Sequence, residues 1–367
     1  MATIYDAARR AGVTAATVSY VVNGKRRVGE ETRARVLAAL EEVGYRPNLL
    51  ARGLARRRIS TVALLLPSIA DSFYPEIALE VERVARERGY HLLLCNTRYD
   101  TRLGRTHLDS LSGHLVDGIL AMAGGLDLDD VVIAHAHGVP VVLCNWCNRT
   151  DRHYDDALPS VDIDVRGGGE LVARHLLDLG HQRIGVIMPK NTADYTSHMY
   201  RLEGFRATLD RHGIALSKDC LECADATIEG GYRAAEHLIM LPNRPTAIFA
   251  TADTMALGAL QAAIDSGLRV PADLSLVGFD DIALGACVRP ALTTIAIPKG
   301  DLASASIELL LRLVEGTGMA REPHPPHVTI HPSLVVRRST AAIRGSPVVS
   351  GPPTPGPDGL TGLKGGA

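Results

Sequence analysis

The sequence predicts a small all-α head at the N-terminus, a short connector, and a large α/β body made of two doubly wound lobes. Residues 1–45 contain helix-like segments, whereas residues 61–340 alternate apolar strand-like runs with amphipathic helices. Charge divides in the same way. Residues 1–58 hold 12 Lys and Arg against 5 Asp and Glu, and the remaining residues hold 27 against 36. A basic head on an acidic body indicates a polyanionic partner for the head, although a solvated basic face is the alternative.

The head is predicted to be a helix-turn-helix. Thr3 can cap a first helix that carries Asp6 in its first turn, and Gly12 permits a tight turn after it. Thr14 can cap a second helix. The residues expected to face the core of these helices are Ala7, Ala8, Ala11, Val13, Val18 and Val21. The residues expected to face outward are Ala15, Ala16, Ser19, Tyr20 and Asn23. The second helix would enter the major groove of DNA, and a helical hairpin without a DNA role is the alternative.

A third helix is predicted over residues 30–43, with Gly44 after its end. Its inward face is expected to carry Val36, Leu37, Leu40 and Val43. Residues 46–60 contain Pro47 and an Arg-rich stretch, and they are interpreted as a hinge helix and linker. Residues 341–367 are expected to be a disordered tail, because residues 345–367 hold seven Gly and five Pro.

The body alternates strands and helices. Strands are expected at residues 61–66, 91–95, 118–122, 139–144, 184–188, 247–250 and 274–278. Helices are expected at residues 73–88, 102–113, 127–137, 171–179, 201–211, 231–241 and 254–266. This alternation implies parallel sheets covered on both faces. The 280 residues from 61 to 340 would strain a single open sheet, so we expect two lobes with a ligand cleft between them.

Several other classes of protein fit the sequence less well. Apolar runs are far too short to span a membrane, and the N-terminus carries no apolar signal region, so a cytoplasmic protein is expected rather than a transported-solute receptor. An enzyme is the other alternative, but the chain has no Walker A loop, no G-x-S-x-G elbow and no H-E-x-x-H motif. The glycines at 167–169 can cradle a phosphate, but a tight turn is the simpler interpretation.

No metal and no cofactor are expected. Two C-x-x-C pairs, Cys144 with Cys147 and Cys220 with Cys223, could in principle bind zinc. However, 72 residues separate the two pairs, and the cysteines of cytosolic proteins usually serve as small buried hydrophobic residues. The histidine pairs near residues 135 and 324 are too isolated for a convincing site.

The head carries a more specific pattern than its helices alone. The strings TIYDAA (3–8), AGVT (11–14), TVSYVVN (17–23), ETR (31–33) and GYRPN (44–48) resemble the opening of the lactose/galactose/purine-repressor family of transcription regulators. The departures are Ala7, where Val is usual, and Val22, where Leu is usual. The likeness continues to about residue 340 through FYPEI (73–77), VGFDD (277–281) and PALTTI (290–295). It implies a periplasmic-binding-protein-like effector domain.

The resemblance also implies which residues contact DNA. These are Thr3, Tyr5, Thr14, Ala15, Ala16, Thr17, Tyr20, Asn23, Tyr45 and Asn48 in the head and at the start of the hinge. In the family, paired hinge helices fold on the operator and wedge leucines into the minor groove, and Leu54 and Ala55 occupy those positions. Leu54 packed against the body is the alternative. Tyr20 stands where Arg or His is usual, so the family's operator sequence does not carry over.

In the body, the resemblance implies that an effector contacts Phe73, Tyr74, Asn145, Trp146, Asp164, Arg201 and Asp280. The alternatives are a core position for Trp146, a helix staple for Phe73, and a surface ion pair between Arg201 and Glu203. Lys190 and Ala226 depart from the purine-responsive branch, so no purine is assigned and a sugar or nucleoside-like effector is expected. The tail lacks a leucine heptad, so a homodimer is expected rather than a tetramer. The other expected partners are operator double-stranded DNA and the effector. The protein is therefore expected to be a nucleoid-associated repressor and not an enzyme.

Overall fold

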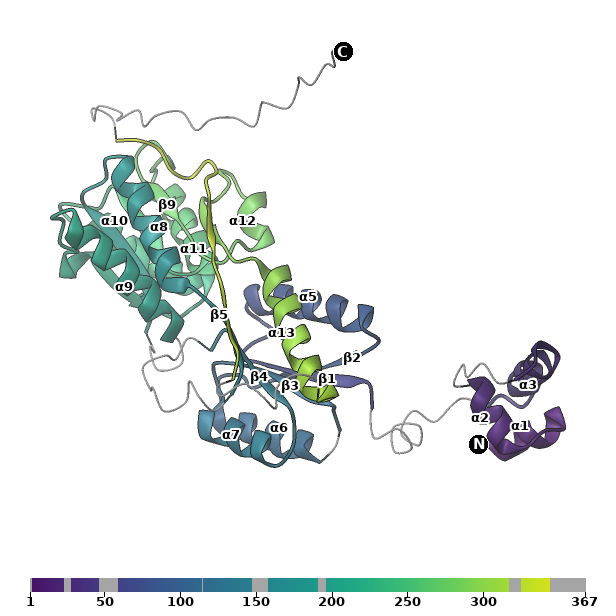
Figure 1. Cartoon of the computed structure of the whole chain (residues 1–367). Coiled ribbons are helices and arrows are strands. Elements are labelled where there is room, and N and C mark those ends of the chain that lie inside the picture. The colour runs from purple at the N-terminus through teal and green to yellow at the C-terminus, as the bar shows by residue number, and fades with distance from the viewer. Residues whose placement is uncertain are drawn as a thin grey trace, which may run out of the picture.

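The computed structural model describes residues 2–22, 28–45, 59–113, 115–146, 158–190, 196–316 and 325–343. The described residues form a helical head and two α/β lobes (Figure 1). Most of the predicted connector and the tail from residue 344 onward lie outside them. No helix in these ranges combines the length and the apolar character needed to cross a bilayer.

The head contains α1 (Ile4–Ala11), α2 (Ala15–Val22) and α3 (Glu30–Glu42). The predicted caps are confirmed. The Thr3 hydroxyl accepts a hydrogen bond from the Asp6 backbone N–H, and the Asp6 carboxylate accepts one from the Thr3 N–H at 2.9 Å. Gly12 ends α1 with φ 66°, a left-handed conformation that favours glycine. The Thr17 N–H donates to the Thr14 hydroxyl at 3.2 Å at the start of α2.

Small side chains form the core of the head. Its buried residues are Ala7, Ala8, Ala11, Val18, Val21, Val36 and Ala39. The prediction that Leu37 faces this core is wrong, because its side chain is 51% exposed. Successive residues of a helix point about 100° apart, and Val36 already fills the inward position.

The first lobe is built on a parallel sheet of six strands in the order β11-β5-β4-β3-β1-β2. Its strands are β1 (Thr61–Leu66), β2 (His91–Asn96), β3 (Gly118–Met122), β4 (Val141–Cys144), β5 (Ser160–Ile163) and β11 (His327–Ile330). Its helices are α5 (Phe73–Glu87), α6 (Thr101–Ser112), α7 (Leu128–Ala136) and α13 (Lys299–Glu315). Leu64 of β1 packs with α5 and α13, whereas Leu65 packs with α6 and α7. The central strands are therefore apolar on both faces, as predicted.

The second lobe has a parallel sheet in the order β7-β6-β8-β9. Its strands are β6 (Ile184–Pro189), β7 (Leu221–Ala224), β8 (Ala247–Ala250) and β9 (Ser275–Val277), beside an antiparallel pair of β10 (Thr294–Ala296) and β12 (Ser333–Val335). Its helices are α8 (Val165–Asp178), α9 (Thr196–Arg211), α10 (Ile228–Met240), α11 (Asp253–Asp265), α12 (Ala283–Cys287) and the 3-10 turn Lys218–Cys220. Phe249 of β8 meets Phe205 of α9 with ring centroids 5.0 Å apart, and Ile248 packs with α10 and α11.

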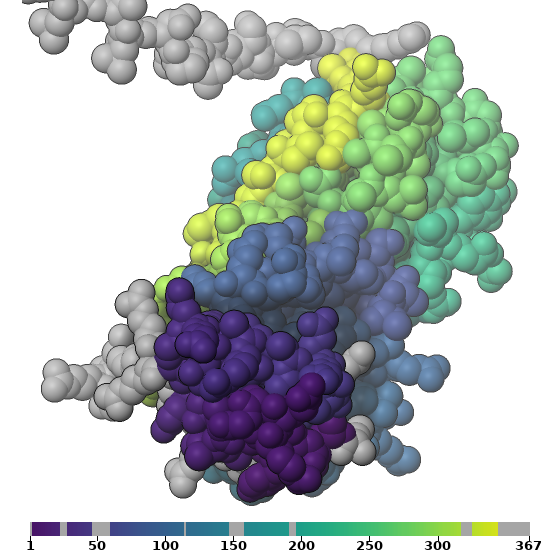
Figure 2. All heavy atoms as spheres, turned by 90° about the vertical axis from the view of Figure 1, so that its right-hand side faces the viewer, coloured from purple at the N-terminus to yellow at the C-terminus, as the bar shows by residue number. Residues whose placement is uncertain are grey.

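The chain crosses between the lobes three times, from β5 to α8, from β10 to α13 and from β11 to β12. The C-terminal described segment, yellow in Figure 2, consequently runs along the surface of both lobes. Residues 341–343 were expected to be disordered, and this is wrong. The Ile343 N–H donates to the Leu179 carbonyl at 3.0 Å, and the Ala341 N–H donates to the Ser275 hydroxyl at 3.1 Å.

Several helices differ from the prediction: α9 begins at Thr196 rather than at residue 201, α10 begins at Ile228 rather than at residue 231, and α12 was not predicted. Helix α8 begins at Val165 rather than at residue 171, because the glycines at 167–169 are helical and do not form a tight turn. A Cβ on Gly169 would lie 2.0 Å from the carbonyl oxygen of Arg201, so α9 approaches α8 as closely as only glycine allows. Helix α13, at the second crossing, was not predicted, although its buried residues repeat with a helical period.

Candidate functional site

Part of the exposed surface of the head is formed by α2 and the start of α1. The predicted DNA contacts in the described part of the head are Thr3, Tyr5, Thr14, Ala15, Ala16, Thr17, Tyr20 and Tyr45. Tyr5 and Tyr20 are 69% and 44% exposed, so these large aromatic side chains do not serve the core of the head. The hydroxyls of Thr14 and Thr17 lie 2.9 Å apart at the start of α2. Backbone N–H groups and the helix dipole at such an end favour an anion such as a phosphate.

The other predicted DNA contacts, Asn23, Asn48, Leu54 and Ala55, lie outside the described residues. Their roles therefore stay predictions. The described head ends at Tyr45, which is half-buried and whose N–H donates to the Leu40 carbonyl at 2.9 Å. The last described residue of the head is thus held by α3.

In the body, side chains from both lobes meet at one cleft. The first lobe supplies the beginning of α5 and the loop after β4, and the second lobe supplies α9 and the loop after β9. Both loops follow the carboxyl ends of parallel strands, where open α/β sheets bind ligands. The predicted effector residues that line the cleft are Phe73, Tyr74, Asn145, Arg201 and Asp280. Asn145 and Asp280 have φ of 52° and 111°, a backbone strain of about 1–3 kcal/mol each that is typical of functional sites.

The most polar part of the cleft is a buried ion pair. Arg201 Nη2 lies 3.0 Å from Asp280 Oδ1, and the two side chains are 3% and 8% exposed. The Arg201 Nη1 also donates to the Thr251 carbonyl at 2.5 Å, and the guanidinium lies 3.9 Å from the centroid of the Phe279 ring. Burial raises the pKa of Asp280 to about 6, although Arg201 opposes that shift. The predicted alternative for Arg201, a surface pair with Glu203, does not form.

Two polar groups of this pair are left for a ligand. Arg201 Nε donates no hydrogen bond, and Asp280 Oδ1 accepts none, because the ion pair is not aligned as a hydrogen bond. A buried donor or acceptor without a partner costs about 1–3 kcal/mol. A ligand hydroxyl can accept from Arg201 Nε or donate to Asp280 Oδ1, so binding would recover this cost.

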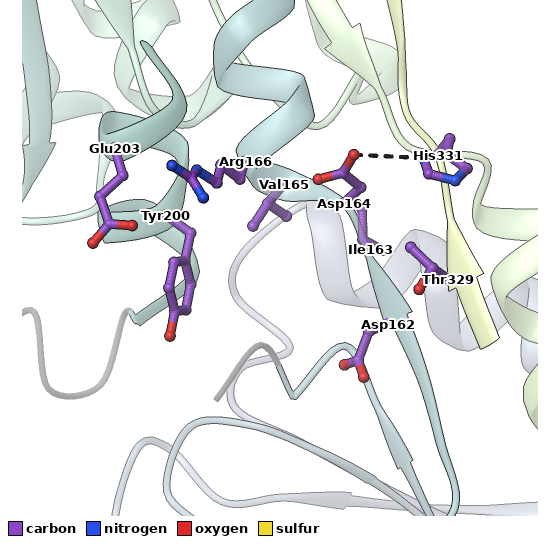
Figure 3. A pocket seen from close by; sticks show the side chains of 9 residues that line it. All are labelled: Asp162, Ile163, Asp164, Val165, Arg166, Tyr200, Glu203, Thr329 and His331. Atoms are coloured by element: carbon purple, nitrogen blue, oxygen red, sulfur yellow. Dashed lines mark ion pairs between the residues drawn. The ribbon is translucent and has the colours of Figure 1, made fainter. Parts of the chain in front are cut away.

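Two predicted effector residues lie elsewhere. The Trp146 ring is buried in the core of the first lobe with α6 and α7, which agrees with its alternative interpretation. Asp164 caps α8, where it accepts from the Gly167 N–H at 2.8 Å and lies 3.5 Å from His331 Nδ1. It lines a separate hollow beside the first and third crossings, together with Tyr200, Glu203 and Thr329 (Figure 3).

The cleft also contains residues that were not predicted. They are Asp71, Tyr99, Ser197, His198, Ala226 and Ala252. His198 donates to or accepts from the Thr251 hydroxyl at 2.8 Å, and burial together with Arg201 holds its pKa well below the usual value, so it is neutral. Burial raises the pKa of Tyr74. The only sequence signal for His198 is its position three residues before Arg201, on the same face of α9.

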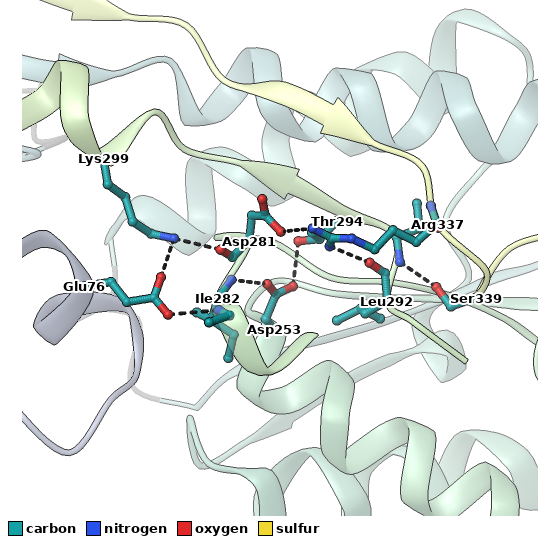
Figure 4. A network of polar contacts seen from close by, with 11 residues as sticks. Glu76, Asp253, Asp281, Ile282, Leu292, Thr294, Lys299, Arg337 and Ser339 are labelled. Carbon is teal, nitrogen blue, oxygen red and sulfur yellow. Dashed lines mark hydrogen bonds and ion pairs between the residues drawn. The ribbon is translucent and has the colours of Figure 1, made fainter. Parts of the chain in front are cut away.

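A polar network joins the lobes beside the cleft (Figure 4). Lys299 Nζ lies 2.8 Å from the Glu76 carboxylate of the first lobe and donates to the Asp281 carbonyl of the second lobe at 2.8 Å. The Ala283 N–H donates to Glu76 at 2.9 Å, and Arg337 pairs with the Asp281 carboxylate at 2.6 Å. The network therefore holds the loop that carries Asp280 against α5.

The described cysteines of the two C-x-x-C pairs lie in different lobes, and Cys147 lies outside the described residues. Cys144 is buried in the first lobe, where its sulfur accepts from the Ser306 hydroxyl at 3.4 Å, and burial raises its pKa to about 12. Cys220 is buried in the second lobe and Cys223 is exposed there. No group of three metal-binding side chains occurs within the described ranges.

Known proteins match both parts of the chain. Residues 3–48 match the family described as "Bacterial regulatory proteins, lacI family", and residues 173–340 match the "Periplasmic binding protein-like domain". Over 310 residues, 84% of this chain and 92% of the relative, the chain is 36% identical to catabolite control protein A of Priestia megaterium. Over 353 residues, 93% of this chain and 97% of the relative, it is 36% identical to the HTH-type transcriptional repressor PurR of Shigella dysenteriae serotype 1.

Solved structures agree with these matches. The lac repressor dimer bound to operator and the anti-inducer ONPF has a TM-score of 0.81 at 29% identity, covering 93% of this chain and 99% of that one. A complex of the transcriptional regulator CelR with cellobiose has a TM-score of 0.67 at 30% identity, covering 92% and 100%. The chain therefore belongs to the lacI family of bacterial regulatory proteins, which are DNA-binding transcription regulators and not enzymes.

Proposed function

We propose that this protein is a nucleoid-associated repressor that binds a near-palindromic operator as a homodimer, one half-site to each head, under the control of a small effector. The strongest support is that one chain carries two features. One is an exposed helix-turn-helix surface, and the other is an interlobe cleft with a buried ion pair in which Arg201 Nε and Asp280 Oδ1 lack hydrogen-bond partners. An effector that prefers one arrangement of the lobes shifts operator affinity by the difference between its affinities for the two arrangements.

For the head, we propose that α2 lies in the major groove. The hydroxyls at its start would contact phosphates, and Tyr20, one turn further on, would reach the bases or the backbone. Ala16 is exposed and can offer only apolar contact, for example to a thymine methyl group. Ala15, which was expected to face outward, packs against the core of the head. The basic charge of the head would supply an affinity that falls steeply with salt.

For the connector, we propose that residues 46–60 act as the hinge and that Leu54 wedges into the minor groove. Leu54→Ala should lose specific operator binding while the body keeps its affinity for effector, because an apolar wedge opens contact area that alanine cannot reach. The measurement is a titration of operator and of scrambled DNA at the same salt concentration. Equal operator affinity of variant and wild type would refute the wedge.

For the body, we propose that a sugar or nucleoside-like effector binds in the cleft at Arg201 and Asp280. Arg201→Ala should abolish the response of operator binding to effector, while operator affinity without effector stays unchanged. The control is Arg211→Ala, because Arg211 lies on the same helix but pairs with Glu170 at 3.3 Å, outside the cleft. A normal effector response of Arg201→Ala would remove the cleft from consideration.

A further inference from the structure

We infer that the interlobe cleft selects uncharged ligands and rejects anionic ones, and that Asp71 of the first lobe is the residue that enforces this choice together with Asp280. The inference rests on the proposed effector site and adds the charge of the ligand it takes. It follows from three features of the described residues: the charges that face the cleft, the bonds already made by Arg201, and the position of Asp71.

The cleft is lined by two acidic side chains and one permanent cation, and burial raises the pKa of both acids. Asp71 and Asp280 contribute two carboxylates from opposite lobes, and Arg201 is the only permanent cation among the described residues of the lining. His198 does not compensate, since it lies buried next to Arg201 and is neutral. A phosphate or carboxylate ligand would therefore place a further negative charge between two acids in a site of low dielectric constant.

The guanidinium of Arg201 is also committed to protein groups. Its Nη1 donates to the Thr251 carbonyl, its Nη2 lies 3.0 Å from Asp280 Oδ1, and its central carbon lies 3.9 Å from the centroid of the Phe279 ring. Arginine binds an anion well through two parallel N–H donors, and only Nε remains without a partner here. One free donor beside one free acceptor, Asp280 Oδ1, matches a hydroxyl, which both donates and accepts.

Asp71 lines the cleft from the first lobe. It lies in the turn before α5, where its Oδ1 accepts from the Phe73 N–H at 2.9 Å. A simple capping role is the competing explanation, but Asp71 also lines the same cleft as Arg201 and Asp280, and burial raises its pKa. Asparagine keeps the capping acceptor and removes the charge, so Asp71→Asn separates the two roles.

The test measures the binding of inorganic phosphate, the smallest anionic probe, to the full-length protein by isothermal titration calorimetry. Wild type should show no phosphate binding that depends on Arg201. The Asp71→Asn and Asp280→Asn double variant should bind phosphate at least about tenfold more tightly than wild type, and adding Arg201→Met should abolish that gain. Asp71→Ser with Asp280→Asn provides a second variant if the first folds poorly, as judged by urea unfolding.

Two results would overturn the inference: Arg201-dependent phosphate binding by wild type, or no gain in folded double variants. A second arm compares glucose with glucose 6-phosphate, ribose with ribose 5-phosphate, and adenosine with its 5′-monophosphate. Tighter binding of a phosphorylated member by wild type would also overturn it. If no member of any pair binds, the effector proposal loses support, while the phosphate arm still decides the question of charge.

Discussion

Replacement of Gly169 by alanine tests the packing that positions Arg201. The Cβ would lie 2.0 Å from the Arg201 carbonyl oxygen and 3.0 Å from the Phe205 backbone nitrogen, and neither backbone atom can move independently of α9. A carbon atom normally stays about 3.3 Å or more from a carbonyl oxygen, so α8 and α9 must separate by about 1.3 Å. The reciprocal contact, Gly204 against the Arg166 carbonyl, would be opened by the same movement.

The expected cost follows from two opposing terms. Forcing a methyl group into a packed interface costs about 1–3 kcal/mol, and the backbone clash places Gly169→Ala at the upper end of this range. Alanine in place of glycine inside a helix returns about 0.5–1 kcal/mol. The net loss in the free energy of unfolding should be about 2 kcal/mol, which lowers Tm by about 4–8 °C.

Urea and thermal unfolding measure this loss, with Gly300→Ala as the matched control. Gly300 also lies within a helix, but the nearest atom to its Cβ would be Glu80 Oε2 at 3.6 Å, an ordinary contact. The control should be neutral or stabilising by up to about 1 kcal/mol. Equal stability of the two variants would refute the argument that α8 carries glycines for close packing. Gly169→Ala should also weaken the effector response, because Arg201 moves with α9.

Two further predictions concern the body. Lys299→Met should lower the free energy of unfolding by about 2–3 kcal/mol, because it removes two short bonds and leaves the partly buried Glu76 carboxylate without its cation. Additive effects of Lys299→Met and Glu76→Gln in a double-mutant cycle would contradict that coupling. Burial lowers the pKa of His181 to about 4, so the unfolded chain binds a proton below pH 6.5 before the folded protein does. Stability should therefore fall by up to about 3 kcal/mol between pH 6.5 and pH 4 from this residue, and a His181→Gln variant with the wild-type pH slope would exclude it.

Local patterns predicted the head and the central strands well. The cap formed by Thr3 and Asp6 and the turn at Gly12 depend on residues three to nine positions apart, so the sequence contains all of their information. The strands around Leu64 and Leu120 are buried on both faces, and such strands appear as continuous apolar runs. Strands β5, β7, β10, β11 and β12 were missed, and β11 lies at the edge of the sheet with much of its surface exposed.

The differences at the site have a common cause. Trp146 and Asp164 resemble effector residues in the sequence, but the direction of each side chain depends on how the loops after β4 and β5 leave the sheet. One loop turns the Trp146 ring into the core, and the other uses Asp164 to cap α8. Asp71 was missed because nothing in its own segment reveals that it lines the same cleft as Arg201 of the other lobe.

The sequence by itself determined the helix-turn-helix, the division of charge between head and body, and the alternation that makes two parallel-sheet lobes. The helix-turn-helix and the alternation depend on residues close together along the chain, and the division of charge follows from composition alone. Only the tertiary structure decided which polar groups meet between the lobes. Glu76 receives a hydrogen bond from a residue 207 positions later in the chain, and Arg201 pairs with Asp280 across two elements of the second lobe. The contact of Glu76 depends on the crossings between the lobes, whereas the Arg201 pair depends on how α9 and the loop after β9 pack within the second lobe, and neither arrangement has a local signal in the sequence.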